Sequence, residues 1–218
     1  MSERKTPICT VCRVEKCRFP DRKGRVPANC PMENYADVRE ESVKRGWTQP
    51  EERKINMACE EVLVKAYGER GARLTRVEEL IEYAKAMGYK KIGLGFCAGL
   101  FEEARIMADI LDKEGFDVVS ISCMAGSARR REDLGLELPE YMGAMECNPL
   151  MQAEVLNREG TEFNVMFGLC LGHDILFIKN SKADVTPLVV KDRVLCHNPL
   201  GTIYNIQSYY KKKLFSPD

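Results

Sequence analysis

The hydrophobic residues of this 218-residue chain follow two different patterns. Residues 1 to about 31 lack an apolar period and are rich in Cys, Pro, Arg and Lys, so this segment cannot bury enough surface to order itself. From residue 48 onward, helical periods and short apolar runs alternate. The pattern predicts a Cys-rich metal-binding knuckle at residues 1–34 and an α/β domain with two leading helices at residues 35–218.

Two helices are expected ahead of the core because two capping boxes precede apolar residues at helical spacing. The first helix extends to Ala66 and carries Cys59 among apolar residues, which favours a core position for that thiol. The second ends at Gly88, a residue type that commonly terminates helices. The two boxes are Thr48 with Glu51 and Thr75 with Glu78.

Short apolar runs and amphipathic segments alternate after Gly88. Such alternation is typical of a parallel sheet of about four strands with helices on both faces, and it predicts an α/β fold. Residues 124–146 are irregular and are expected to form a loop, in which Arg129 to Arg131 face solvent. The expected strands are 91–97, 116–123, 164–170 and 187–190, and the expected helices are 102–113, 148–157 and 174–180.

Four cysteines lie where this topology would bring them together. Right-handed crossovers place the carboxyl ends of parallel strands at one edge, where such sheets bind ligands. Cys97, Cys123 and Cys170 end strands, and Cys147 begins a helix, where the helix dipole stabilises a thiolate. A single Cys at a strand end is usually a small hydrophobe. Four at one edge predict a shared cofactor-binding site, provided that the topology is correct.

Glycines surround the first of these cysteines. Gly93 and Gly95 precede Cys97, and their lack of a side chain would let the backbone approach a cofactor closely. The third glycine and the downstream acidic residue of a dinucleotide-binding motif are not in place. The segment therefore does not predict a dinucleotide site.

Charged and ionisable residues gather at the same predicted edge. His173 lies between Cys170 and Asp174, where it could ligate a metal or act as an acid or base. The segment 191–193, Lys-Asp-Arg, could hold a charged substrate or an anionic cluster, or could form a solvated strand end. The roles of His197 and Cys196 stay open. The candidate catalytic residues are Cys97, Cys147, His173 and Lys191.

Composition narrows the function classes. Lys plus Arg and Asp plus Glu both number 33, so the net charge implies neither a nucleic-acid partner nor an anionic membrane. The polar N-terminal sequence and the lack of a long apolar run predict a cytoplasmic protein. In a reducing cytosol, ten cysteines are more often metal ligands or reactive thiols than disulfides.

The strongest metal motif is the N-terminal set, in which two cysteines have the close C-x2-C spacing. Four thiolates in a segment without a core suit a tetrahedral zinc or a [4Fe-4S] cluster, which would supply the missing folding free energy. The sequence does not choose between these metals, and four free thiols are the alternative. The predicted ligands are Cys9, Cys12, Cys17 and Cys30.

Taken as a set, these motifs resemble a bacterial and archaeal family, domain of unknown function 1847. The resemblance covers nearly the whole chain. It implies metal binding, a label that follows the cysteines, and it implies no reaction. The motifs that carry it are Cys9-x2-Cys12-x4-Cys17, Cys30-Pro31, Gly95-Phe96-Cys97, Cys147-Asn148-Pro149, Gln152-Ala153-Glu154, the run Gly168 to Asp174, Lys191-Asp192-Arg193 and His197-Asn198-Pro199.

Three functions agree with these patterns. The first is a redox enzyme in which the four sheet-edge cysteines bind a second iron–sulfur cluster, with His173 and Lys191 facing a small substrate. The second keeps zinc at the N-terminal site and makes Cys97 or Cys147 the nucleophile of thiol or sulfur chemistry. The third is a non-catalytic metal-handling or regulatory protein. No pattern identifies the substrate, the redox partner or the oligomeric state.

Overall fold

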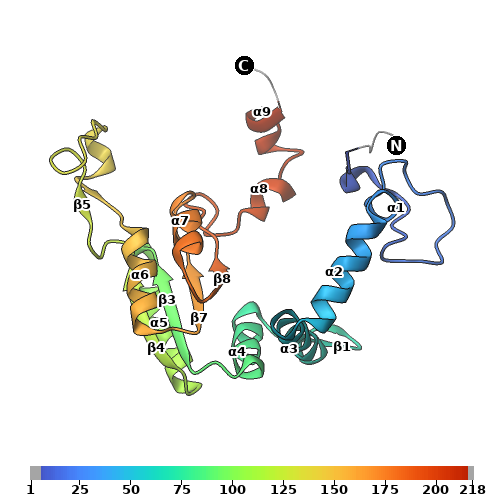
Figure 1. Ribbon diagram of the computed structural model, residues 1–218. Coiled ribbons are helices and arrows are strands. Elements are labelled where there is room, and N and C mark those ends of the chain that lie inside the picture. The colour runs from blue at the N-terminus through green and yellow to red at the C-terminus, as the bar shows by residue number, and fades with distance from the viewer. Residues whose placement is uncertain (1–5, 216–218) are drawn as a thin grey trace. The chain divides into compact units, whose positions relative to one another are not determined.

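The computed structural model describes residues 6–215 and divides into two compact units, residues 1–61 and 62–218 (Figure 1). Residues 1–5 of the predicted knuckle and residues 216–218 of the predicted α/β domain lie outside the described residues. The domain boundary predicted at residue 34 falls within the first unit. That unit holds η1 (Cys9–Val11), α1 (Pro31–Asn34), α2 (Ala36–Thr48) and most of α3 (Pro50–Ala66).

The helix predicted to start at Thr48 begins two residues later, and the capping box at this position was wrong. Thr48 is the last residue of α2, and its Oγ1 donates a hydrogen bond back to the Lys44 carbonyl, 2.7 Å away. Pro50 begins α3 because a proline is well accommodated in the first turn of a helix. Cys59 in α3 is exposed, so its predicted core position was also wrong.

The second unit contains the predicted parallel sheet. Its four strands pair in the order β4-β3-β7-β8, and every pairing is parallel. All four carboxyl ends therefore lie at one edge, which confirms the topology on which the predicted cysteine site depends. The strands are β3 (Lys91–Phe96), β4 (Asp117–Ser122), β7 (Phe163–Phe167) and β8 (Asp184–Val189).

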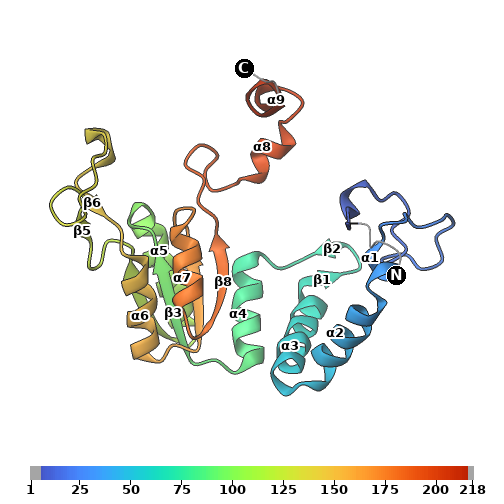
Figure 2. The same ribbon diagram turned by 45° about the horizontal axis from the view of Figure 1, so that its top comes forward.

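Helices pack on both faces of this sheet, as predicted (Figure 2). One core cluster joins α4 (Arg76–Met87) and α5 (Phe101–Lys113) to alternate residues of β3 and β7. The other joins α6 (Pro149–Glu159) and α7 (His173–Asn180) to the opposite face. The capping box at Thr75 is confirmed, as is the N-cap of α6 at Asn148, whose side chain accepts from the Met151 amide.

The remaining elements are short. Residues 124–146, expected to be irregular, contain a small antiparallel pair made by β5 and β6. Two further short strands, β1 and β2, follow α3. These elements are β1 (Tyr67–Gly68), β2 (Gly71–Ala72), η2 (Ala98–Leu100), β5 (Ala128–Arg129), η3 (Glu140–Met142), β6 (Met145–Glu146), α8 (Leu200–Tyr204) and α9 (Tyr209–Phe215).

The two glycines of β3 serve the core. A Cβ on Gly95 would lie 2.6 Å from the ring of Phe177, and one on Gly93 would lie 2.8 Å from a Leu156 methyl. Both are shorter than ordinary van der Waals contacts, so α6 and α7 can pack this closely only against glycine. The structure thus gives these glycines a packing role, where the sequence suggested close approach of a cofactor.

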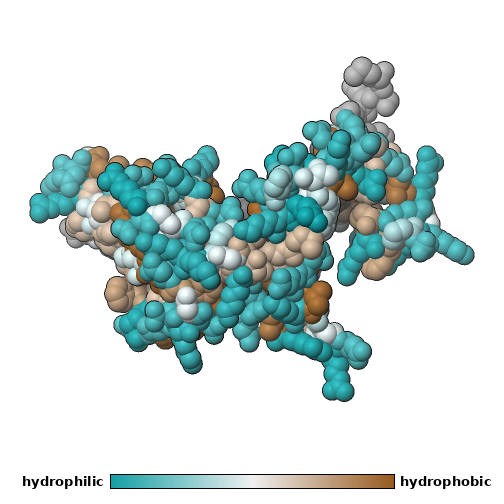
Figure 3. All heavy atoms as spheres, turned by 60° about the horizontal axis from the view of Figure 1, so that its bottom comes forward, coloured by the Kyte–Doolittle hydropathy of each residue, from teal (hydrophilic) through white to brown (hydrophobic). Residues whose placement is uncertain are grey.

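On the face drawn in Figure 3, hydrophilic residues predominate and hydrophobic ones are scattered among them. This distribution agrees with a chain in which 30% of the residues are charged. Within residues 6–215, no helix has both the length and the apolar character that a membrane span requires.

Candidate thiol site at the carboxyl edge of the sheet

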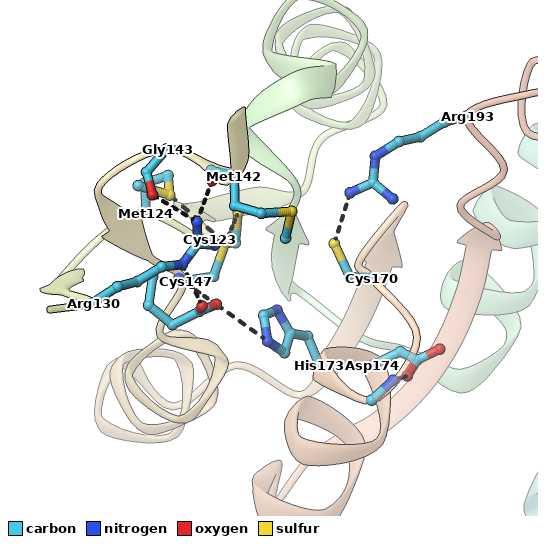
Figure 4. Close-up of polar contacts among 12 residues, drawn as sticks. Cys123, Met124, Arg130, Met142, Gly143, Cys147, Cys170, His173, Asp174 and Arg193 are labelled. Atoms are coloured by element: carbon cyan, nitrogen blue, oxygen red, sulfur yellow. Dashed lines mark hydrogen bonds and ion pairs between the residues drawn. The ribbon is translucent and has the colours of Figure 1, made fainter. Parts of the chain in front are cut away.

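The structure brings the four sheet-edge cysteines to the edge predicted for them. Cys97 follows β3 and Cys123 follows β4, and the strand ladder continues to these positions. The Cys123 amide donates to the Phe96 carbonyl at 2.8 Å, and the Cys97 amide donates to the Phe167 carbonyl at 3.0 Å. Cys170 lies beyond the end of β7, and Cys147 lies just before α6 (Figure 4). Their backbones are therefore fixed by the sheet and by the start of a helix.

Among the four sheet-edge cysteines, Cys97 has the most contacts that stabilise a negatively charged sulfur. The Lys191 ammonium contacts its Sγ, and the Gly99 amide donates to the same atom at 3.4 Å. The pKa of Cys97 is lowered to about 4. The largest cause is a hydrogen bond from the Cys123 thiol, and the Lys191 and Gly99 contacts act in the same direction, whereas burial raises the pKa. Cys97 is only 8% exposed. The lowered pKa favours the thiolate form of Cys97 at neutral pH, although little of the residue is exposed to solvent.

Cys123 is the protonated partner of this thiolate. Its hydrogen bond to Cys97 and its burial raise the pKa of Cys123, because both favour the thiol form. The Ala98 amide donates to its Sγ at 3.3 Å, and the Cys147 sulfur lies 3.4 Å from it. The proton shared by Cys97 and Cys123 therefore resides on Cys123.

Cys147 continues the chain of sulfur atoms. Its thiol lies 3.7 Å from the Met124 sulfur as well as 3.4 Å from the Cys123 sulfur. Burial raises the pKa of Cys147, although the Cys123 contact acts in the opposite direction. The start of a helix was expected to lower the pKa of Cys147, but at this position burial has the larger effect and raises it.

Cys170 has its own cation. Arg193 donates from its guanidinium to the Cys170 Sγ at 3.1 Å, and this contact raises the pKa of Arg193. Lys191 and Arg193 both follow β8, so one loop supplies a cation to each of two cysteines. Figure 4 shows the Arg193 contact with Cys170. The 191–193 segment was interpreted as holding a charged substrate or cluster, and in the structure its cations contact sulfur atoms of the site.

The two histidines differ. His197 stabilises the loop after β8, because its Nδ1 accepts from the Asp192 amide at 3.1 Å and its amide donates to the Asp192 carbonyl. Its neighbour Cys196 is exposed, and both residues have positive φ angles. His173 is the first residue of α7, and its Nε2 lies 3.6 Å from Glu146 Oε1. Only His173 of the two therefore faces another candidate ligand.

Glu146, which the sequence argument did not single out, connects the loop 124–146 to the site. Its Oε2 accepts from Arg130 Nε at 2.8 Å, and its Oε1 accepts from the Cys147 amide at 3.0 Å. The Arg130 contact lowers the pKa of Glu146 and keeps it ionised. Arg130 also contacts the carbonyls of Met142 and Gly143. Its side chain is only 13% exposed, so the expectation that Arg130 faces solvent was wrong.

Gln152 holds the ends of the two strands that carry Cys97 and Cys123. This fully buried residue of α6 donates from Nε2 to the Ile121 carbonyl at 2.8 Å and to the Phe96 carbonyl at 3.1 Å. The run Gln152-Ala153-Glu154 was quoted only for its resemblance. Its first residue has a structural role directly below the thiols.

The N-terminal cysteines lie apart from this site in sequence and are described within their own unit. All four line one cavity, which also has walls from residues 26–33. The Glu15 amide donates to the Cys12 Sγ at 3.4 Å. Across residues 6–215, no three of these sulfur atoms come within 4.8 Å of one another. The structure therefore gathers the set without forming a closed tetrahedral site.

Glu146, Cys147 and His173 do approach one another closely, with one ligand atom from each lying within 4.8 Å of the others. This donor set, together with the many cysteines, fits metal binding. It does not identify the metal or cluster.

The chain matches one protein family and is similar to an archaeal protein. Residues 30–188 match the family described as protein of unknown function (DUF1847). An uncharacterized protein of Methanocaldococcus jannaschii is 49% identical over 140 residues, which cover 64% of this chain and 71% of that protein. The family match includes Cys30 and the four sheet-edge cysteines, and it begins after the other three N-terminal ones. The resemblance inferred from the motifs is confirmed: the chain belongs to the DUF1847 family.

Proposed function

We propose that this chain is a thiol-based redox or sulfur-transfer enzyme in which Cys97 is the nucleophile and Cys123 is the second, resolving thiol. The observation that carries this proposal is the pair of donors on the Cys97 sulfur, the Lys191 ammonium and the Gly99 amide. A cation and an amide directed at a thiol are the usual means by which proteins hold a reactive thiolate.

Among the sheet-edge thiols, Cys97 suits this role best. Cys123 and Cys147 both have raised pKa values, so they are protonated at neutral pH. Cys170 has the Arg193 contact, but within residues 6–215 no thiol donates a hydrogen bond to its sulfur as Cys123 does to Cys97. The protonated Cys123 thiol beside the Cys97 thiolate provides both a hydrogen-bond donor and a second sulfur.

The backbone geometry supports a disulfide between these two residues. Phe96 pairs with Ser122 in the β3–β4 ladder, so the next residues, Cys97 and Cys123, follow at equivalent positions. Neighbouring strands lie about 4.8 Å apart, and disulfides join Cα atoms about 4.4–6.8 Å apart. The pair therefore needs little backbone movement to form a bond.

The reaction with a disulfide substrate balances as follows. The Cys97 thiolate attacks one sulfur of the substrate, a mixed disulfide forms, and the other sulfur leaves as a thiolate. Cys123 then gives its proton to solvent and attacks the Cys97 sulfur, which releases the second half of the substrate as a thiolate. The substrate is reduced by two electrons, and the enzyme disulfide is reduced again by an external dithiol.

This arrangement suits a four-iron cluster less well. Such a cluster binds its four thiolates at separate corners, so its ligands are separated by the width of the cluster. The Cys123 and Cys147 sulfur atoms lie 3.4 Å apart, and Lys191 and Arg193 contact the other two sulfurs. These contacts favour thiol chemistry over the iron–sulfur alternative at the sheet edge.

A metal at the N-terminal cysteines remains part of the proposal. The cavity lined by Cys9, Cys12, Cys17 and Cys30 supports it, as does the lack of an apolar period in this segment. The metal would stabilise the fold, with zinc and [4Fe-4S] both compatible with four thiolates. It would take no part in the thiol reaction.

The test uses glutathione disulfide as the probe. Reduced full-length protein is exposed to it at about pH 6, where ordinary thiols with a pKa of about 8.5 are mostly protonated. Mass spectrometry of peptides then locates the adducts. In the Cys123→Ser variant we expect a stable glutathione adduct on Cys97, because the resolving thiol is missing. In the wild type we expect a Cys97–Cys123 disulfide.

Cys59→Ser is the matched control, because this exposed thiol lies in α3 and should not alter either product. Adducts confined to exposed cysteines such as Cys59 and Cys196, with Cys97 still reduced, would contradict the proposal. That outcome would favour the non-catalytic, metal-handling alternative.

A further inference from the structure

Glu146, Cys147 and His173 form a cluster that the thiol reaction does not use. Each residue is partly buried, and one ligand atom from each lies within 4.8 Å of the others. Glu146 and Cys147 are consecutive at the end of β6, whereas His173 starts α7. The sheet topology thus brings a carboxylate, a thiol and an imidazole together from two loops at the same edge (Figure 4).

The carboxylate of this cluster is oriented by a second set of contacts. Arg130 binds Glu146 Oε2 at 2.8 Å, which leaves Oε1 on the side of His173. Arg130 is itself held by the Met142 and Gly143 carbonyls, so loop 124–146 fixes the guanidinium. Metal-binding carboxylates typically have such outer partners, which set their orientation and charge.

From this geometry we propose a metal site in which Glu146, Cys147 and His173 bind one divalent ion of the zinc class. A mixed oxygen, sulfur and nitrogen donor set suits a borderline ion such as Zn²⁺ better than a hard ion such as Mg²⁺. The site is distinct from the four N-terminal cysteines, and it does not depend on the nucleophilic role of Cys97.

The distances agree with a tetrahedral ion. Two ligand atoms bound to zinc at about 2.0–2.1 Å each lie roughly 3.4 Å apart. The Glu146 Oε1 to His173 Nε2 distance is 3.6 Å, longer than a hydrogen bond and close to this value. A sulfur ligand at about 2.3 Å from zinc would lie roughly 3.6 Å from either atom, so Cys147 would approach by at most about an ångström.

Binding would release the proton of the Cys147 thiol to solvent and leave His173 neutral. Three protein ligands leave one tetrahedral position for water or a small ligand, the pattern of catalytic rather than structural zinc sites. The Cys123 thiol lies 3.4 Å from the Cys147 sulfur, so an ion bound by Cys147 would lie near the thiol pair.

The experiment measures zinc stoichiometry of the full chain after chelation and reloading, together with the absorption of a Co²⁺-loaded sample. The chain has only two histidines, which gives a matched pair of variants. We expect His173→Gln to hold one zinc fewer than the wild type, and His197→Gln to hold as much as the wild type. Glu146→Gln, which keeps the side-chain shape, should behave as His173→Gln does.

The cobalt spectrum provides a second measurement. A thiolate-to-cobalt absorption band that is weaker in His173→Gln and unchanged in His197→Gln supports the site. Equal zinc content and equal cobalt spectra in wild type, His173→Gln and Glu146→Gln would overturn it. Cys12→Ser tests the N-terminal metal separately, and its loss of metal should add to the loss in His173→Gln. Circular dichroism verifies that each variant is folded.

Discussion

The Lys191 ammonium contacts the Cys97 sulfur although 94 residues separate them. Cys97 follows β3, and Lys191 follows β8, with β7 between these strands in the sheet. The lysine therefore reaches across the end of β7 to a cysteine that follows a strand two positions away. Such a contact forms only when β3, β7 and β8 have paired.

Replacing Lys191 with Met should raise the pKa of Cys97. The lowered pKa of about 4 means that Cys97 stays ionised as the pH falls from neutral to about 5, whereas ordinary thiols are protonated there. Loss of an adjacent cation typically shifts a pKa by about one to three units, so the midpoint should move upward by that amount. Ultraviolet thiolate absorbance against pH measures the midpoint.

Lys113→Met is the control for this titration. Lys113 is an exposed residue near the end of α5, and its removal should leave the Cys97 midpoint unchanged. The same midpoint in Lys191→Met and wild type would mean that the cation does not stabilise the thiolate. The Cys97→Ser variant identifies the absorbance that belongs to Cys97.

Replacing Arg130 with Met should weaken metal binding at Glu146, Cys147 and His173 without removing a ligand. Arg130 orients the Glu146 carboxylate, and loss of such an outer partner typically costs about 10- to 100-fold in metal affinity. Competition with a chromogenic zinc chelator measures the affinity. Arg131→Met is the control, because Arg131 pairs with the exposed Glu137 instead. Equal weakening by both variants would refute the positioning role.

Gln152→Leu should destabilise the fold. The Ile121 and Phe96 carbonyls would each lose a hydrogen bond, at a cost of about 0.5–1.5 kcal/mol per bond in the free energy of unfolding. Urea denaturation monitored by circular dichroism measures this change. Glu154→Ala, an exposed position of the same helix, should change stability much less. A Gln152→Leu protein as stable as the wild type would show that these hydrogen bonds contribute little.

Gly95→Ala should also destabilise the chain, because the new methyl group would lie 2.6 Å from the Phe177 ring. Overpacking of this kind costs about 1–3 kcal/mol. Gly99→Ala is the matched control, since its nearest neighbour, the Cys97 sulfur, would be 3.8 Å from the added methyl. Thermal unfolding of both variants measures the difference. Similar losses in the two would contradict a specific clash with Phe177.

Cys12→Ser should release the proposed N-terminal metal and expose its segment to protease. Structural metals supply folding free energy that small Cys-rich segments lack. Elemental analysis measures the metal, and limited proteolysis followed by mass spectrometry locates cleavage within residues 6–34. Cys59→Ser should change neither result. Wild-type metal content in Cys12→Ser would count against the N-terminal site.

Much of the fold follows from local patterns. The capping box at Thr75, the N-cap at Asn148 and a parallel sheet of four strands could all be predicted. The convergence of Cys97 and Cys123 followed in turn, because parallel strands place their carboxyl ends together. Thr48 was wrongly expected to begin a helix because α2, which ends at Thr48, was not expected. The polar composition of α2 hides its helical period.

The partners of the thiols were harder to predict. Arg130 and Glu146 lie in a loop without periodicity, and their pairing depends on how that loop folds back. Arg130 belongs to a run of three arginines, which resembles a solvated surface until its contacts are known. The one signal for Glu146 in the sequence was its position directly before Cys147.

The separation of Lys191 from Cys97 along the chain has a consequence for protein synthesis. Cys97 leaves the ribosome 94 residues before Lys191, so the nascent chain carries this cysteine without its cation. Cys123, whose thiol is the larger cause of the low pKa, also emerges later than Cys97. The sulfur therefore has neither partner when it leaves the ribosome, and it gains the Lys191 contact only after β8 has joined the sheet.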